Sequence, residues 1–228
     1  MVKFGILFVL LALPVGAADI ALDIGHSFKK PGVISASGIR EMELNKRLAR
    51  AVAARLIKNG IVCHLIGDDG KMDVLTDRTE AATGDRLFLS FHHDSVLQAW
   101  RDRADEFSGF SLFVSRKNPR LNESLACAQR LGVKLIASGF KPSRYHALPV
   151  DGENRPFADE MRGVHYFDDL VVLKTAKQPA VLIEAGVIVN PRDEQRVASE
   201  EGRNRLADAV ASGAAECLTL LERHKAEK

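Results

Sequence analysis

The chain has 228 residues, of which 46% are hydrophobic and 27% are charged. This is enough apolar material for one sizeable core, and it excludes an intrinsically disordered protein. Lys and Arg number 32 against 30 Asp and Glu, and the charges are spread along the sequence. Neither a nucleic-acid-binding stripe nor a polybasic membrane patch is indicated. We therefore expect one domain and no nucleic-acid partner.

The first 17 residues follow the plan of a signal peptide. Lys3 precedes an apolar run of about ten residues, roughly half the length that a membrane-spanning helix requires, and Pro14 interrupts it. We predict cleavage after Ala17 or Ala18. The mature domain, residues 18–228, then has no stable membrane span and is secreted, with the periplasm as its expected location. A buried N-terminal strand or helix is the alternative interpretation.

Cysteine usage gives little support for a disulfide framework or a thiolate zinc site. The three cysteines, Cys63, Cys127 and Cys217, lie far apart and have no CxxC spacing. At most one bridge can form, and the sequence leaves open which two of them pair.

Apolar strands alternate with amphipathic helices along the chain. The clearest helix is Glu41–Asn59, with leucine or valine at steps of four and Gly60 as its C-cap. Residues 141–167 are predicted to be irregular. The other predicted helices are Val74–Ala82, Pro119–Ser138 and Asn204–Arg223. The predicted strands are Ile20–Ile24, Ile61–Ile66, Arg86–Phe91, Gly109–Ser115, Leu170–Leu173 and Ala180–Ile183.

This order of elements predicts the fold class. Continuous apolar strands separated by helices are typical of an α/β domain whose sheet is covered on both faces. We expect a single three-layer domain, with a twisted, mostly parallel six-stranded sheet flanked by helices.

Titratable side chains occur where several predicted strands end. His26 follows the first strand, His92 and His93 follow the third, and Glu184 lies at the end of the last. Glu41 begins the first helix, which follows the first strand through a loop. Since ligands of open α/β sheets bind outside the carboxyl ends of the strands, these residues are the candidates for a site.

Two imidazoles and one carboxylate form a set that suits a catalytic zinc with one position open to water. Each ligand also has an ordinary explanation, because a histidine after a strand can be a hydrogen-bonded loop residue and Glu41 is favoured at a helix N-terminus. Glu184 is harder to explain in this way, since a carboxylate in an apolar strand is costly unless it has a partner. Burial should raise its pKa toward the range of a general base.

Four ordered motifs resemble those of the zinc-dependent N-acetylmuramoyl-L-alanine amidases, which are cell-wall hydrolases. The family patterns D-P-G-H, E-K-x-x-N, S-I-H-A-N/D and V-L-V-E-x-G-F-x-S-N match, in order and spacing, residues 23–26, 41–45, 90–94 and 181–190. Arg78–Ala82 and Arg162–Val164 resemble further family segments. The resemblance implies that His26, Glu41 and His92 bind Zn²⁺ and that Glu184 is the catalytic glutamate.

The resemblance also implies a substrate. This is the amide bond between N-acetylmuramic acid and L-alanine of the peptidoglycan stem peptide, with peptidoglycan as the partner. A requirement for an activator protein stays open. Ile24 and His93 depart from the family pattern, as do Ala185 and Val187, but none of these departures removes a ligand.

Two other functions are compatible with the same residues. One is a zinc hydrolase of another amide, and another is a periplasmic wall-binding or regulatory domain that has lost turnover. Residues 141–161 are expected to form a loop of the substrate groove. The alternative is an autoinhibitory segment that caps the metal with carboxylates from Glu153, Asp159 or Glu160.

Overall fold

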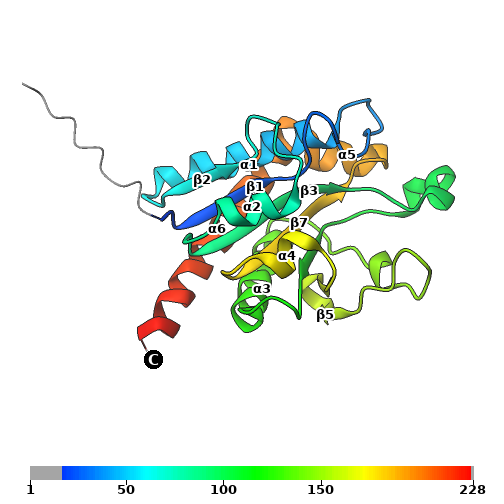
Figure 1. The fold of residues 1–228 in the computed structure, drawn as a ribbon. Helices are drawn as coiled ribbons and strands as arrows, with labels where there is room; N and C mark the ends of the chain where they lie inside the picture. Colours follow the sequence, from blue (N-terminus) through cyan, green and yellow to red (C-terminus); the bar gives the residue numbers. More distant parts are fainter. Residues whose placement is uncertain (1–16, 227–228) are drawn as a thin grey trace, which may run out of the picture.

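The computed structural model describes residues 17–226, so the predicted signal peptide lies outside the described residues apart from Ala17. Seven strands form one sheet in the order β2-β1-β3-β7-β4-β6-β5 (Figure 1). Strands β2, β1, β3 and β7 run parallel, whereas the β7–β4 and β6–β5 pairs are antiparallel. The strands are β1 (Ile20–Ile24), β2 (Cys63–Ile66), β3 (Leu87–Asp94), β4 (Ser111–Val114), β5 (Phe157–Asp159), β6 (Val164–Tyr166) and β7 (Ala180–Val187).

Helices cover both faces of this sheet, which gives the expected three layers (Figure 1). One face packs against α1, α3 and α6 and the other against α2 and α4, each across its own hydrophobic core. The α-helices are α1 (Glu41–Lys58), α2 (Leu75–Ala81), α3 (Leu121–Ala137), α4 (Val171–Thr175), α5 (Pro191–Ala198) and α6 (Glu200–Ala226). The 3₁₀ helices are η1 (Gln98–Glu106), η2 (Tyr145–Ala147) and η3 (Glu160–Arg162).

The predicted count of six strands is wrong, and so is the strand predicted at Leu170–Leu173. That segment forms the short helix α4, whose Val172 and Leu173 are buried in the smaller core. A run of four apolar residues fits a buried helical turn as well as a strand, so the pattern could not decide. The two strands that the prediction lacked, β5 and β6, have three residues each and lie at the edge of the sheet beyond β4.

A disulfide joins Cys127 of α3 to Cys217 of α6, and Cys63 is a free thiol. Both bridged residues are fully buried in the larger core. The bridge therefore ties together two of the three helices that cover one face of the sheet. Among the described residues, no helix combines the length and the apolar character needed to cross a bilayer.

The topology brings the carboxyl ends of three adjacent parallel strands to one edge. These are β1, β3 and β7, which are neighbours in the sheet and end near Ile24, Asp94 and Val187. Helix α1 begins at the same edge, after the loop that follows β1. The candidate residues named from the sequence all lie here.

Candidate metal centre and active site

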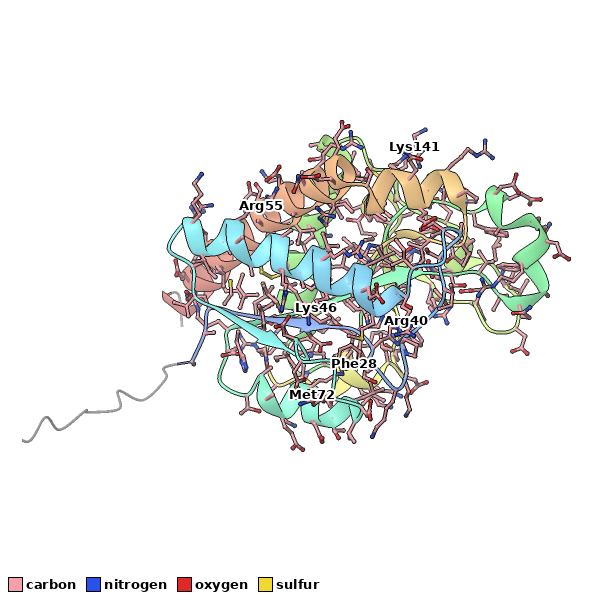
Figure 2. The ribbon with its side chains drawn as sticks, turned by 90° about the horizontal axis from the view of Figure 1, so that it is seen from above. Phe28, Arg40, Lys46, Arg55, Met72 and Lys141 are labelled. Atoms are coloured by element: carbon pink, nitrogen blue, oxygen red, sulfur yellow. A yellow bond between two sulfur atoms is a disulfide. The ribbon has the colours of Figure 1, made fainter. Side chains whose placement is uncertain are left out.

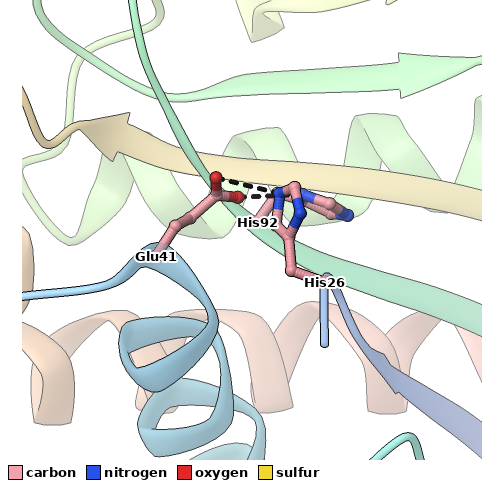
Figure 3. Close-up of side chains that lie close together, drawn as sticks. All are labelled: His26, Glu41 and His92. Carbon is pink, nitrogen blue, oxygen red and sulfur yellow. Dashed lines mark hydrogen bonds and ion pairs between the residues drawn. The ribbon is translucent and has the colours of Figure 1, made fainter. Parts of the chain in front are cut away.

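His26, Glu41 and His92 meet at this edge (Figure 3). His26 Nε2 lies 2.9 Å from Glu41 Oε2, and His92 Nδ1 lies 3.0 Å from Glu41 Oε1. One ligand atom from each residue lies within 4.8 Å of the other two, a spacing at which the three could hold one metal ion. Two imidazole nitrogens and a carboxylate are a donor set that suits zinc and related transition metals.

The backbone before His26 is shaped by the close packing of the two rings. A Cβ atom at Gly25 would lie 2.3 Å from His92 Nε2, so only glycine leaves room for the imidazole. His26 itself has a φ of 72°, in the left-handed region that residues other than glycine rarely adopt. The two rings meet edge to face, with centroids 4.9 Å apart. Strain of this kind is common at binding sites that the surrounding structure fixes.

The buried side chain of Arg78 holds the turn that carries His26. Its guanidinium donates to Asp23 Oδ1 and to the carbonyl oxygen of Ile24, both at 2.6 Å, and also to the carbonyl oxygen of His26. Ser90 of β3 donates to the other oxygen of Asp23 at 2.7 Å. Asp23 at the end of β1 therefore accepts from Arg78 of α2 and from Ser90 of β3, and these contacts fix the turn that carries His26.

Glu41 is positioned by α1 and by hydrogen bonds from its neighbours. It is only 4% exposed, and Asn45, one turn later, donates to its Oε1 at 3.3 Å and to the carbonyl oxygen of Gly25 at 3.2 Å. Burial raises the pKa of Glu41, but the hydrogen bonds and charges of His26 and His92 outweigh it and hold the pKa well below its usual value. The carboxylate is therefore ionised and ready to bind a cation.

His93 points away from this group. Its Nδ1 lies 2.8 Å from Asn45 Oδ1, and burial lowers its pKa to about 4, so the ring is neutral. Adjacent residues of a strand face opposite sides of the sheet, so His92 reaches the metal group and His93 does not. His93 contributes to the position of Asn45 and hence of Glu41.

Glu184 lies beside His92 on the neighbouring strand. The two are register partners in the β3–β7 pair, so their side chains share a face of the sheet. Among the described atoms, Glu184 Oε2 is buried and has no hydrogen-bond partner. Burial, followed by the charges of Asp94 and Glu41, raises the pKa of Glu184 well above its usual value, although Arg155 opposes the shift. The predicted direction of this shift is confirmed.

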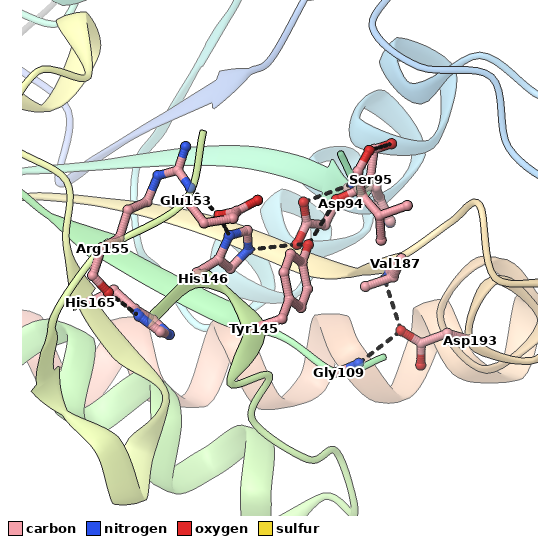
Figure 4. Close-up of polar contacts among 12 residues, drawn as sticks. Asp94, Ser95, Gly109, Tyr145, His146, Glu153, Arg155, His165, Val187 and Asp193 are labelled. Carbon is pink, nitrogen blue, oxygen red and sulfur yellow. Dashed lines mark hydrogen bonds and ion pairs between the residues drawn. The ribbon is translucent and has the colours of Figure 1, made fainter. Parts of the chain in front are cut away.

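A network of charged side chains (Figure 4) lines one cavity together with Glu184. His146 of η2 lies between two carboxylates, with Nε2 2.7 Å from Asp94 Oδ2 and Nδ1 2.8 Å from Glu153 Oε2. Arg155 also pairs with Glu153. Burial lowers the pKa of His146, but the two carboxylates outweigh it and raise the pKa to about 9. His146 lies within residues 141–167, which are predicted to be irregular, and nothing local in the sequence indicates these pairings.

Comparison with known proteins decides the family. A family model described as N-acetylmuramoyl-L-alanine amidase matches residues 20–216. The chain belongs to this family of peptidoglycan amidases. The amidase AmiA of Salmonella typhimurium is 25% identical to the chain over 213 residues, which is 85% of this chain and 74% of that protein. AmiA of Escherichia coli is 24% identical over 223 residues, with 87% and 75% covered.

Solved structures of such amidases share the fold. AmiC2 of Nostoc punctiforme superposes with a TM-score of 0.70 at 24% identity, over 90% of this chain and 98% of that chain. Ami1 of Mycobacterium smegmatis gives a TM-score of 0.72 at 23% identity, with 90% and 99% covered. The α/β architecture predicted from the sequence is thus that of known N-acetylmuramoyl-L-alanine amidases.

Proposed function

We propose that this amidase cleaves the bond between N-acetylmuramic acid and L-alanine of peptidoglycan stem peptides. In the proposal Zn²⁺ is bound by His26, Glu41 and His92, and Glu184 carries the proton. The observation that supports it best is the position of Glu184 on the strand beside His92, with its Oε2 atom buried and without a hydrogen-bond partner among the described atoms. A carboxyl without a partner in such a place needs a function, because its burial is costly.

The ligand set would leave zinc a position for water. Bound zinc supplies two effects in such hydrolases, since it lowers the pKa of its water and polarises the scissile carbonyl. Glu184 then takes the proton that the attacking water loses and returns it to the nitrogen of the leaving amine. Burial suits it to this role, because a raised pKa makes a carboxylate a stronger proton acceptor.

We also propose export to the periplasm, on the basis of the predicted signal peptide. An activator protein is a further proposal. The CwlD amidase from Clostridioides difficile, solved in complex with the GerS lipoprotein, superposes on this chain with a TM-score of 0.65 at 17% identity. That complex supports the proposal, because in it an amidase of the same fold is bound to another protein.

The test compares the mature protein, residues 18–228, with three variants. Zinc content is measured by elemental analysis, and release of free stem peptide is measured on purified sacculi. Glu184→Gln should keep zinc and lose hydrolysis, whereas His26→Ala should lose both. Glu43→Gln is the matched control, because Glu43 is a second carboxylate of the same helical turn that lies outside the metal group.

The outcomes separate the parts of the proposal. Zinc near one per chain, with peptide released by the wild type and not by Glu184→Gln, supports both the metal and the proton carrier. Full activity of Glu184→Gln would remove Glu184 from the mechanism. Zinc without peptide release by any form would indicate another substrate or an activator requirement, and absence of zinc would favour a non-catalytic wall-binding domain.

A further inference from the structure

Two cavities of different chemistry flank the proposed centre. One, of about 220 Å³, has Glu184 in its wall together with charged groups such as His146 and Arg155. The other, of about 230 Å³, has His26 and His92 in its wall. No described residue lines both cavities. The exposed surface of the second is mostly apolar, and its apolar side chains are Met72, Leu75, Leu170, Val172 and Leu182.

The proposed reaction determines which half of the substrate faces each cavity. Because Glu184 returns its proton to the leaving amine, the amine nitrogen and the peptide behind it lie on the Glu184 side. The acyl half of the amide, which is the lactyl group with its sugar, must then extend the other way, past His26 and His92. This step rests on the proposed function.

The loop after β1 lines this second cavity and carries an exposed aromatic residue. Phe28 lies between Ser27 and Lys30, which both line the cavity, and it is 58% exposed (Figure 2). No other aromatic side chain among the described residues is exposed to a comparable extent. Single exposed apolar residues are common on protein surfaces, so it is the position of Phe28 in the loop that lines the cavity, and not its exposure alone, that suits a binding role.

The ring of Phe28 is held in place rather than free to collapse into the cavity. Its backbone N–H donates to the carbonyl oxygen of Gly70 at 2.8 Å. The ring lies over Gly70, where a Cβ atom would come within 2.5 Å of a ring carbon. Gly70 therefore leaves room for the ring to pack closely against the backbone of this turn, while more than half of the Phe28 side chain stays exposed.

We propose that Phe28 is a stacking platform for the N-acetylated sugar on the acyl side of the substrate. The C–H face of a pyranose ring packs on an aromatic face, and the apolar cavity beside Phe28 suits the methyl groups of the lactyl and acetyl substituents. Lys30 and Asp73 line the same cavity and can hydrogen-bond to hydroxyl groups. The sugar thus lies toward α2 and α4, and the peptide toward β4.

The first test compares two substrates, N-acetylmuramoyl-L-alanyl peptide and the corresponding lactoyl-L-alanyl peptide without the sugar. Phe28→Ala should raise the KM of the sugar-bearing substrate relative to the sugar-free one about fivefold while kcat is retained, as expected for the loss of one aromatic contact. Phe28→Trp should restore the wild-type ratio. Ile57→Ala is the matched control, since Ile57 is 60% exposed at the far end of α1 and should leave the ratio unchanged.

The second test needs no hydrolysis. Saturation-transfer NMR measures binding of free N-acetylmuramic acid to Glu184→Gln protein, with and without Phe28→Ala. Sugar signals that require Phe28 support the platform even where no amide is cleaved, in which case the proposed reaction alone fails. Equal sugar signals in the two proteins, or a KM ratio that Phe28→Ala does not change, would overturn the platform and leave the reaction in place.

Discussion

The Cys127–Cys217 bridge should contribute strongly to stability, and its removal gives a quantitative test. The two residues are 90 positions apart in sequence and their Cα atoms are 4.9 Å apart, a separation that a disulfide spans without distortion. Closing a loop of that length removes enough entropy from the unfolded chain to stabilise the fold by about 4–5 kcal/mol at 25 °C. Because both cysteines are fully buried, the native packing around them should not compensate.

The assay is urea unfolding followed by far-UV circular dichroism, on oxidised and reduced protein of equal metal content. Reduction and the double variant Cys127→Ala/Cys217→Ala should each lower the free energy of unfolding by several kcal/mol. Cys63→Ala is the control, because Cys63 is a free thiol and its loss should change stability by less than about 1 kcal/mol. If the fully reduced protein unfolds at the same urea concentration as the oxidised one, the argument from loop closure is refuted.

Three further predictions concern buried charged groups. Because the pKa of His146 is about 9 in the folded protein and near 6.5 in the unfolded chain, its contribution to stability is complete below about pH 6.5 and is lost as the pH rises through 9. Urea unfolding at a series of pH values should show that the free energy of unfolding falls by about 3 kcal/mol over this range, and His146→Gln should lack this fall. Arg78→Met should lower the free energy of unfolding by about 3–5 kcal/mol and weaken zinc binding in competition with a chelator, because it leaves Asp23 buried and unpaired. The backbone nitrogen of Ala18 lies 2.7 Å from Asp85 Oδ1, so cleavage after Ala17 would convert this nitrogen into an ammonium group paired with that carboxylate. Mass spectrometry of the exported protein should therefore find Ala18 as the N-terminal residue. Asp85→Asn should destabilise the form that begins at Ala18 more than a form that keeps Ala17.

The sequence predicted the fold class because its strands and helices have strong, long periods. The helix at Glu41–Lys58 and the strand at Ala180–Val187 could be recognised locally, since each carries enough apolar residues to define its period. β5 and β6 could not be recognised, because three-residue edge strands depend on their pairing with β4 rather than on their own pattern. For the same reason the count of strands was wrong while the architecture was right.

The candidate site was predictable to a similar degree. The ends of parallel strands meet at one edge, so the residues that follow β1 and β3 could be placed together from the order of the elements alone. What the sequence could not show is how the ligands are held. Asn45, Arg78 and Asp94 act through hydrogen bonds to residues 20 to 55 positions away, and no local pattern specifies such partners.

The three candidate capping carboxylates of residues 141–161, which are Glu153, Asp159 and Glu160, all form ion pairs. An autoinhibitory cap would need a free carboxylate facing the metal group. Glu153 instead pairs with His146 and Arg155, Asp159 pairs with Arg162, and Glu160 pairs with Arg144. Because all three carboxylates form ion pairs elsewhere, we do not expect this segment to cap the metal group. The segment lines the cavity of Glu184, and its charged network places the peptide side of the proposed groove in a polar setting opposite the apolar cavity beside Phe28.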